Sequence, residues 1–113
     1  MVVSQSESTE IKRDYLTHFG FEPDLVFGWE LGIDQRKPNP YPVEITLQTL
    51  SLLPQDCLMV DDMRMGLDMV KPFGIDFALA SWSHGEPEIV NDMKHASTYV
   101  VESVEALSKI VFG

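Results

Sequence analysis

Two adjacent carboxylates, Asp61 and Asp62, directly follow a short apolar run at residues 57–60. Like charges at neighbouring positions repel each other unless a cation lies between or near them. Carboxylate oxygens at a strand end suit Mg²⁺, which takes one or two carboxylates and keeps several waters. The pair therefore predicts a magnesium site, and a solvated turn that caps a helix is the alternative, because Asp is favoured there too.

A second feature is Lys37, which opens the stretch KPNP. The prolines stiffen the loop and hold the lysine in one orientation. Asn39 is a good N-cap and Pro40 suits the first helical position, so a helix is expected to begin here. An ammonium group beside a helix N-terminus makes an anion site, for which phosphate is the natural ligand. A surface lysine in a turn is the alternative.

Ser4 follows Val2 and Val3, which could form the end of a strand. A hydroxyl at a strand end can donate to a phosphate oxygen, although most such serines cap a turn. Only the combination is informative: Ser, Lys and the Asp pair occur in that chain order, each at or near an expected strand end.

The elements that must position these side chains alternate along the chain. Short apolar strands are expected near residues 2–3, 25–27, 57–60, 77–80 and 99–101. Between them lie helical stripes of apolar residues at positions 11, 15 and 19, at 43, 47 and 50, at 65, 69 and 70, at 89, 90 and 93, and at 104, 107 and 111.

Ser8 or Thr9 is expected to cap the first helix, and Gly20 is expected to close it. The run at 57–60 is continuous, as expected for a strand covered on both faces. The alternation predicts an α/β fold, a Rossmann-like three-layer sandwich with a mainly parallel sheet. In such sheets ligands bind beyond the carboxyl ends of the strands.

The composition excludes several classes of protein. The chain of 113 residues has 8 Lys and Arg against 18 Asp and Glu, a net charge of −10. That balance argues against nucleic-acid and anionic-membrane partners, which need a basic surface. One Cys excludes a disulfide framework and a Cys-based zinc site. Apolar runs are far shorter than the roughly 20 residues of a membrane span, and no signal peptide is visible. We expect one small cytoplasmic domain.

In order and spacing these residues resemble the haloacid dehalogenase-like (HAD) hydrolase superfamily, in its phosphoglycolate-phosphatase-like branch. That family's second motif is an apolar strand ending in Ser or Thr, and its third is a Lys, often in Lys-Pro-x-Pro. Its fourth is a strand ending in an acidic pair or in Gly-Asp. The matching residues here are Ser4, Lys37, Asp61 and Asp62, followed by Gly66, Lys71 and Gly74. The resemblance runs from residue 2 to about residue 82.

The resemblance implies Mg²⁺-dependent hydrolysis of a small phosphorylated metabolite. Ser4 would hydrogen-bond the transferring phosphoryl group, and Lys37 would neutralise charge on it and on the nucleophile. Asp61, together with Asp62, would hold Mg²⁺. Phosphoryl transfer depends mainly on positioning and charge stabilisation. A chain with a net charge of −10 would repel a phosphate ester, so Mg²⁺ and Lys37 must make the electrostatic potential positive at the site.

The family's first motif, Asp-x-Asp, is absent from the sequence. In the family its first Asp is the nucleophile that forms an aspartyl-phosphate, and its second is the general acid and base. The resemblance places that strand, and the cap domain after it, before Met1. We therefore expect residues 1–113 to form a partial HAD-like core that lacks the central nucleophile strand and the cap and is inactive as an isolated chain.

In the family the nucleophile strand is central, so the resemblance implies that it would lie between the strands that end at Ser4 and at Asp61. Neighbouring strands lie about 4.8 Å apart, so its loss leaves roughly 9–10 Å, too far for direct hydrogen bonds. The gap is expected to close by rearrangement, or its strand edges to pair with another chain or with a second copy.

Two other functions compete with a phosphatase. A non-catalytic remnant that binds phosphate or a protein fits the absent nucleophile. A receiver-like signalling domain is less favoured, because there the acidic pair comes early and the Lys last. Dinucleotide and Walker-type sites need a Gly-rich phosphate loop that this sequence lacks.

The remaining reactive side chains favour ordinary roles. His18, His84 and His95 are scattered and are expected at the surface. Cys57 opens an apolar run without basic neighbours, which predicts an inert buried thiol. Trp82 follows a strand, where packing at the strand end is the preferred interpretation and lining of a substrate pocket the alternative.

Overall fold

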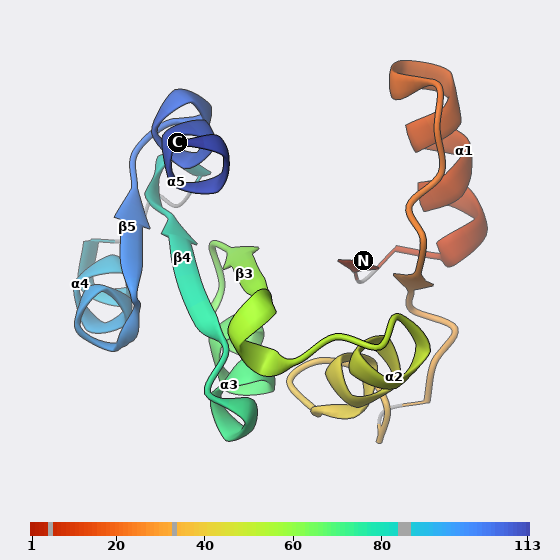
Figure 1. Cartoon of the computed structure of the whole chain (residues 1–113), viewed down its shortest axis with the longest axis horizontal. Coiled ribbons are helices and arrows are strands. Elements are labelled where there is room, and N and C mark those ends of the chain that lie inside the picture. The colour runs from red at the N-terminus through yellow and green to blue at the C-terminus, as the bar shows by residue number, and fades with distance from the viewer. Residues whose placement is uncertain (5, 33, 84–86) are drawn as a thin grey trace. The chain divides into compact units, whose positions relative to one another are not determined.

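The computed structural model describes residues 1–4, 6–32, 34–83 and 87–113, so His84 lies outside the described residues. The chain forms two compact units, Met1–Leu52 and Leu53–Gly113 (Figure 1). Within the described ranges no helix is both long and apolar enough to cross a membrane.

The first unit contains two strands and two helices. In chain order these are β1 (Val2–Val3), α1 (Ser8–Phe19), β2 (Val26–Phe27) and α2 (Tyr41–Thr49). The strands pair in parallel, with Val2 opposite Val26. Ile11 packs its side chain inward from α1, and Gly20 ends that helix in the left-handed region at φ 77°. The expected end of α1 at Gly20 is therefore confirmed.

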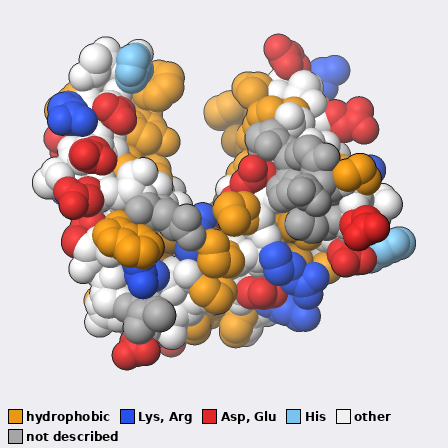
Figure 2. All heavy atoms as spheres, turned by 180° about the vertical axis from the view of Figure 1, so that it is seen from behind, with side chains coloured by type: hydrophobic (Ala, Val, Ile, Leu, Met, Phe, Trp, Pro, Cys, Tyr) orange, Lys and Arg blue, Asp and Glu red, His pale blue; other side chains and the backbone are white. Residues whose placement is uncertain are grey.

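Several aromatic side chains of the first unit remain at its surface. The ring of Tyr15 contacts those of Phe19 and Phe21, at centroid distances of 5.4 and 5.8 Å. Phe19 and Phe21 are nevertheless more than half exposed. Figure 2 shows hydrophobic side chains at the surface of this unit. The apolar stripe of α1 is thus only partly buried within the unit.

The second unit is built around three parallel strands in the order β3-β4-β5 (Figure 1). The strands are β3 (Leu58–Asp61), β4 (Asp76–Ala80) and β5 (Tyr99–Val101). The helices are α3 (Arg64–Val70), α4 (Pro87–Ala96) and α5 (Val104–Phe112), with short 3₁₀ turns η1 (Pro54–Asp56), η2 (Lys71–Phe73) and η3 (Ser81–Ser83).

The core of the second unit is centred on β4. Phe77 and Leu79 of this strand are 1% and 0% exposed. Other fully buried side chains come from the elements on either side: Met69, Val70, Met93 and Val101. Thr98 ties the start of β5 to β4, because its Oγ1 accepts a hydrogen bond from the Phe77 N–H and its own N–H donates to the Phe77 carbonyl.

The expectation that residues 57–60 form a strand covered on both faces is wrong. Val60 of β3 is 37% exposed, and Leu58 and Met59 are half-buried. The reason is the position of the strand: β3 pairs only with β4 within the described residues and forms the edge of its sheet.

The predicted α/β fold with parallel strands is confirmed, and each expected strand is present. The strands belong to two sheets, β1-β2 and β3-β4-β5.

Candidate functional site

Asp61 is the last residue of β3 and is half-buried. Its Oδ1 accepts hydrogen bonds from the N–H groups of Asp62 (2.7 Å) and Met63 (3.3 Å). These bonds fix the carboxylate at the carboxyl end of the strand. They also show that Asp61 closes the turn before α3, while the N-cap residue of that helix is Met63.

Gly66 holds the first turn of α3 close to Asp61. A Cβ atom at Gly66 would lie 2.7 Å from the Asp61 Cβ and 2.8 Å from its Cγ, and it would collide with Oδ2. A real Cβ does not approach other atoms so closely. The Asp61 side chain is therefore confined by backbone N–H groups on one side and by a glycine on the other.

Asp61 and Asp62 fit Mg²⁺ by donor type. Mg²⁺ binds through one or two carboxylates and fills its other positions with water or substrate oxygens. Among the described residues no group of three or more His, Cys, Asp or Glu side chains could hold a metal ion. Any cation here would depend on this pair, both members of which are half-buried.

Lys37 lies in the loop before α2 and is half-buried. Asn39 stabilises that loop: its Oδ1 accepts from the Tyr41 N–H (2.9 Å), and its own N–H donates to the Arg36 carbonyl (2.9 Å). The Arg36 guanidinium stacks 3.8 Å from the centre of the Trp29 ring. The helix α2 begins at Tyr41 with Pro40 as its N-cap, so the expected N-cap at Asn39 and first helical residue at Pro40 are each one position too early. Asn39 nevertheless accepts from the first N–H of the helix.

Ser4 follows β1, and its N–H donates to the Phe27 carbonyl (2.9 Å). Its Oγ accepts a hydrogen bond from the Ser6 N–H (3.1 Å), so the hydroxyl closes a local turn. A serine hydroxyl also has one proton to donate. Accepting from Ser6 does not use that proton.

The four predicted site residues fall into two pairs. Ser4 and Lys37 belong to the first unit, whereas Asp61 and Asp62 belong to the second. Ser4 directly follows β1, Asp61 ends β3 and Asp62 follows it, whereas Lys37 lies in the loop between β2 and α2.

Glu30 caps α1, a role that the sequence did not indicate. The helix begins at Ser8, so the expected cap by Ser8 or Thr9 is wrong. Instead Glu30 Oε2 accepts from the Ser8 N–H (3.1 Å). Hydrogen bonds from the Ser8 side chain and from backbone N–H groups, with the charge of Lys12, lower the pKa of Glu30. The partners are 22 residues apart, too far for a local cap signal.

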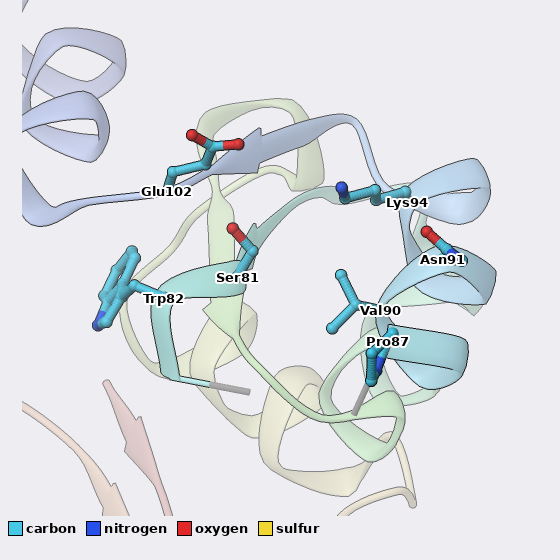
Figure 3. Close-up of a pocket in the computed structure, with 7 residues that line it drawn as sticks. All are labelled: Ser81, Trp82, Pro87, Val90, Asn91, Lys94 and Glu102. Carbon is cyan, nitrogen blue, oxygen red and sulfur yellow. The ribbon is translucent and has the colours of Figure 1, made fainter. Parts of the chain in front are cut away.

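The second unit also contains a pocket of about 410 Å³ (Figure 3). It is lined by Ser81, Trp82, Pro87, Val90, Asn91, Lys94 and Glu102. Trp82 lines this pocket and is 44% exposed, so the preferred interpretation from the sequence, a side chain packed at the strand end, is wrong.

Of the other reactive side chains, the described histidines lie at the surface as predicted, whereas Cys57 is less buried than predicted. His18 and His95 are exposed. Cys57 is half-buried, and burial, together with the charge of Asp56, raises the pKa of its thiol. A raised pKa leaves little thiolate, which agrees with an inert cysteine.

Solved structures similar to this chain include haloacid dehalogenase-like proteins. A candidate phosphoglycolate phosphatase from Lactobacillus delbrueckii matches with a TM-score of 0.74 and 20% identity, over 99% of this chain and 46% of that one. A haloacid dehalogenase-like protein of unknown function from Agrobacterium tumefaciens matches with a TM-score of 0.78 and 19% identity, over 96% and 51%. A candidate beta-phosphoglucomutase from Thermotoga maritima gives 0.66 and 17%, over 97% and 51%.

No family model and no curated protein sequence matches the chain. At these identities the structural similarity shows the fold. The chain spans about half the length of the structures it matches. The expected HAD-like, Rossmann-like fold is therefore confirmed for a partial core.

Proposed function

We propose that this chain, which has the fold of half an HAD-like protein, carries the phosphate- and magnesium-binding residues of a phosphomonoester hydrolase. The observation that carries the proposal is the confined carboxylate of Asp61 at the carboxyl end of β3. Ligands of parallel sheets bind at that end. The 113 residues contain no Asp-x-Asp, so we propose no turnover by the isolated chain.

In this proposal each residue has one task. Asp61 and Asp62 would hold Mg²⁺, which would supply positive charge at the phosphate oxygens. The Ser4 hydroxyl would donate its free proton to a phosphate oxygen, and the Lys37 ammonium would neutralise a second one. The substrate class is a small phosphorylated metabolite.

A Mg²⁺ titration tests the metal site. Isothermal titration calorimetry of the whole chain should show weak Mg²⁺ binding that Asp61→Asn abolishes, because the amide removes the charge and keeps the shape. Asp76→Asn is the matched control: Asp76 is an exposed aspartate at the other end of the same sheet, on β4. A titration unchanged by Asp61→Asn would remove the proposed site.

A second candidate is a non-catalytic module that pairs through the edge of β3. Its specific support is that β3 pairs only with β4 among the described residues and that Val60 is 37% exposed. Edge strands present unpaired backbone groups to other chains, and charged side chains discourage such pairing. We propose self-association through this edge.

Sedimentation velocity would test edge pairing. Val60→Lys should shift an oligomer toward monomer, while Val104→Lys, at an exposed position on α5, should not. A wild-type chain that stays monomeric over a wide concentration range would contradict self-association.

A further inference from the structure

The pocket of the second unit lies at the carboxyl ends of two neighbouring strands. Ser81 directly follows β4, and Glu102 directly follows β5. Its opposite wall is one face of α4, because Pro87, Val90, Asn91 and Lys94 recur at helical spacing (Figure 3). In parallel sheets, ligands bind beyond the carboxyl ends of the strands, which is where this pocket lies. The pocket uses none of the residues of the proposed phosphate site.

Its charged side chains are one cation and one anion. Lys94 comes from α4 and Glu102 from the end of β5, so they reach the pocket from different elements (Figure 3). In the part of the chain that the structure describes, neither has an ion-pair partner. The two charges do not neutralise each other directly and are both available to a ligand.

The remaining lining combines apolar surface with hydrogen-bonding groups. Pro87 and Val90 are apolar, and the Trp82 ring is 44% exposed. An exposed indole offers a face on which a planar ring can stack. The Ser81 hydroxyl is already committed to the Val101 carbonyl (3.0 Å), which leaves the Asn91 amide as the neutral polar group for a ligand.

We propose that this pocket binds a small aromatic zwitterion, a molecule with one carboxylate, one ammonium group and a planar ring. The carboxylate would pair with Lys94, the ammonium with Glu102, and the ring would stack on Trp82. A pocket of about 410 Å³ is at the lower end of the usual size for small-molecule sites. A phosphate dianion fits less well, because the single cation Lys94 is opposed by Glu102.

Trp82 itself provides the readout. The chain has two tryptophans, so Trp29→Phe leaves Trp82 as the sole indole. This variant of the full chain is titrated with L-phenylalanine, with phenylacetate, which lacks the ammonium, and with phenethylamine, which lacks the carboxylate. L-phenylalanine should change Trp82 fluorescence saturably and bind more tightly than either fragment. Calorimetry on the wild-type chain repeats the L-phenylalanine titration with Trp29 in place.

Two substitutions assign the charges. Lys94→Gln should weaken L-phenylalanine and phenylacetate by up to about fivefold, as expected for one exposed ion pair, and leave phenethylamine unchanged. Glu102→Gln should weaken L-phenylalanine and phenethylamine and leave phenylacetate unchanged. Lys109→Gln and Glu105→Gln, on α5 and outside the pocket lining, are the matched controls and should change nothing.

Three outcomes would overturn the proposal. One is the lack of a saturable signal with all three probes. Another is an equal loss for all probes in both variants. The third is a control variant that weakens binding as much as Lys94→Gln or Glu102→Gln. Because no arm involves Mg²⁺, phosphate or Asp61, these results are independent of the test of the proposed function.

Discussion

Asp61 is held in place partly by a residue without a side chain. Gly66 lets the first turn of α3 approach the Asp61 carboxylate more closely than any other residue would allow. The two backbone hydrogen bonds to Oδ1 then set its orientation. If Asp61 binds Mg²⁺ as proposed, a carboxylate confined in this way would lose little conformational freedom when the cation binds.

Gly66→Ala should lower the free energy of unfolding by about 1 kcal/mol. Alanine within a helix normally gains about 1 kcal/mol over glycine, but forcing an extra methyl group into a filled space costs about 1–3 kcal/mol. The new methyl would meet the Asp61 Cβ and Cγ, and the Cβ cannot move without the backbone. Urea denaturation measures the change.

Gly32→Ala is the control for this substitution, because a Cβ at Gly32 would meet nothing within 4 Å. It should not destabilise the chain through a collision. A Gly66→Ala chain as stable as the wild type would contradict the confinement of Asp61.

Glu30 makes the stability of the first unit depend on pH. Its pKa is lowered in the folded chain, mainly by the hydrogen bond with Ser8, so its contribution is present above the ordinary glutamate pKa. That contribution is lost as the pH falls through the folded pKa. Glu30→Gln should therefore lower the melting temperature at about pH 7 and make little difference at about pH 3.

Glu22→Gln, at an exposed glutamate of the same unit, should leave the melting temperature unchanged at either pH. If Glu30→Gln lowers the melting temperature equally at both pH values, the charge of Glu30 has no part in the cap.

At the scale of elements, β4 and β3 have similar apolar sequences and different surroundings. Leu79 in β4 is fully buried, whereas Val60 in β3 is 37% exposed. Leu79→Ala should destabilise the second unit by about 2–5 kcal/mol, because it removes buried methyl groups and leaves a cavity. Val60→Ala should cost less than about 1 kcal/mol, since that side chain is only partly removed from water. Chemical denaturation followed by circular dichroism compares them, and equal losses would contradict the central position of β4.

The sequence predicted the positions of helices and strands along the chain better than it predicted which residues lie beside them in space. The apolar runs located the strands, and Gly20 was recognised as a helix end, where it adopts a positive φ. The run at 57–60 did not reveal that β3 is an edge strand, because that depends on pairing with distant residues. For the same reason the Glu30 cap and the exposure of Trp82 were not predicted.

At the scale of the whole molecule, the order of the motifs along the chain predicted the fold, although no family model matches the sequence. Chain order can do this because the predicted site residues follow the ends of parallel strands or precede a helix, positions fixed by topology. It cannot give the distances between side chains, which depend on how the two units pack.

The whole chain should show no appreciable Mg²⁺-dependent hydrolysis of generic phosphomonoesters. The physical reason is the lack of an Asp-x-Asp nucleophile among its 113 residues. A colorimetric assay of phosphate release with p-nitrophenyl phosphate measures the rate. Turnover typical of a competent enzyme that disappears in Asp61→Ala would contradict this expectation.

The central position of β4 also sets the order in which backbone amides exchange with solvent deuterium. A strand with a hydrogen-bonded neighbour on each side and with buried side chains opens only when the surrounding unit opens. Amides of residues 77–80 should therefore be the slowest to exchange in the second unit. Those of the two-residue strands β1 and β2 should exchange early, since opening that pair breaks few bonds.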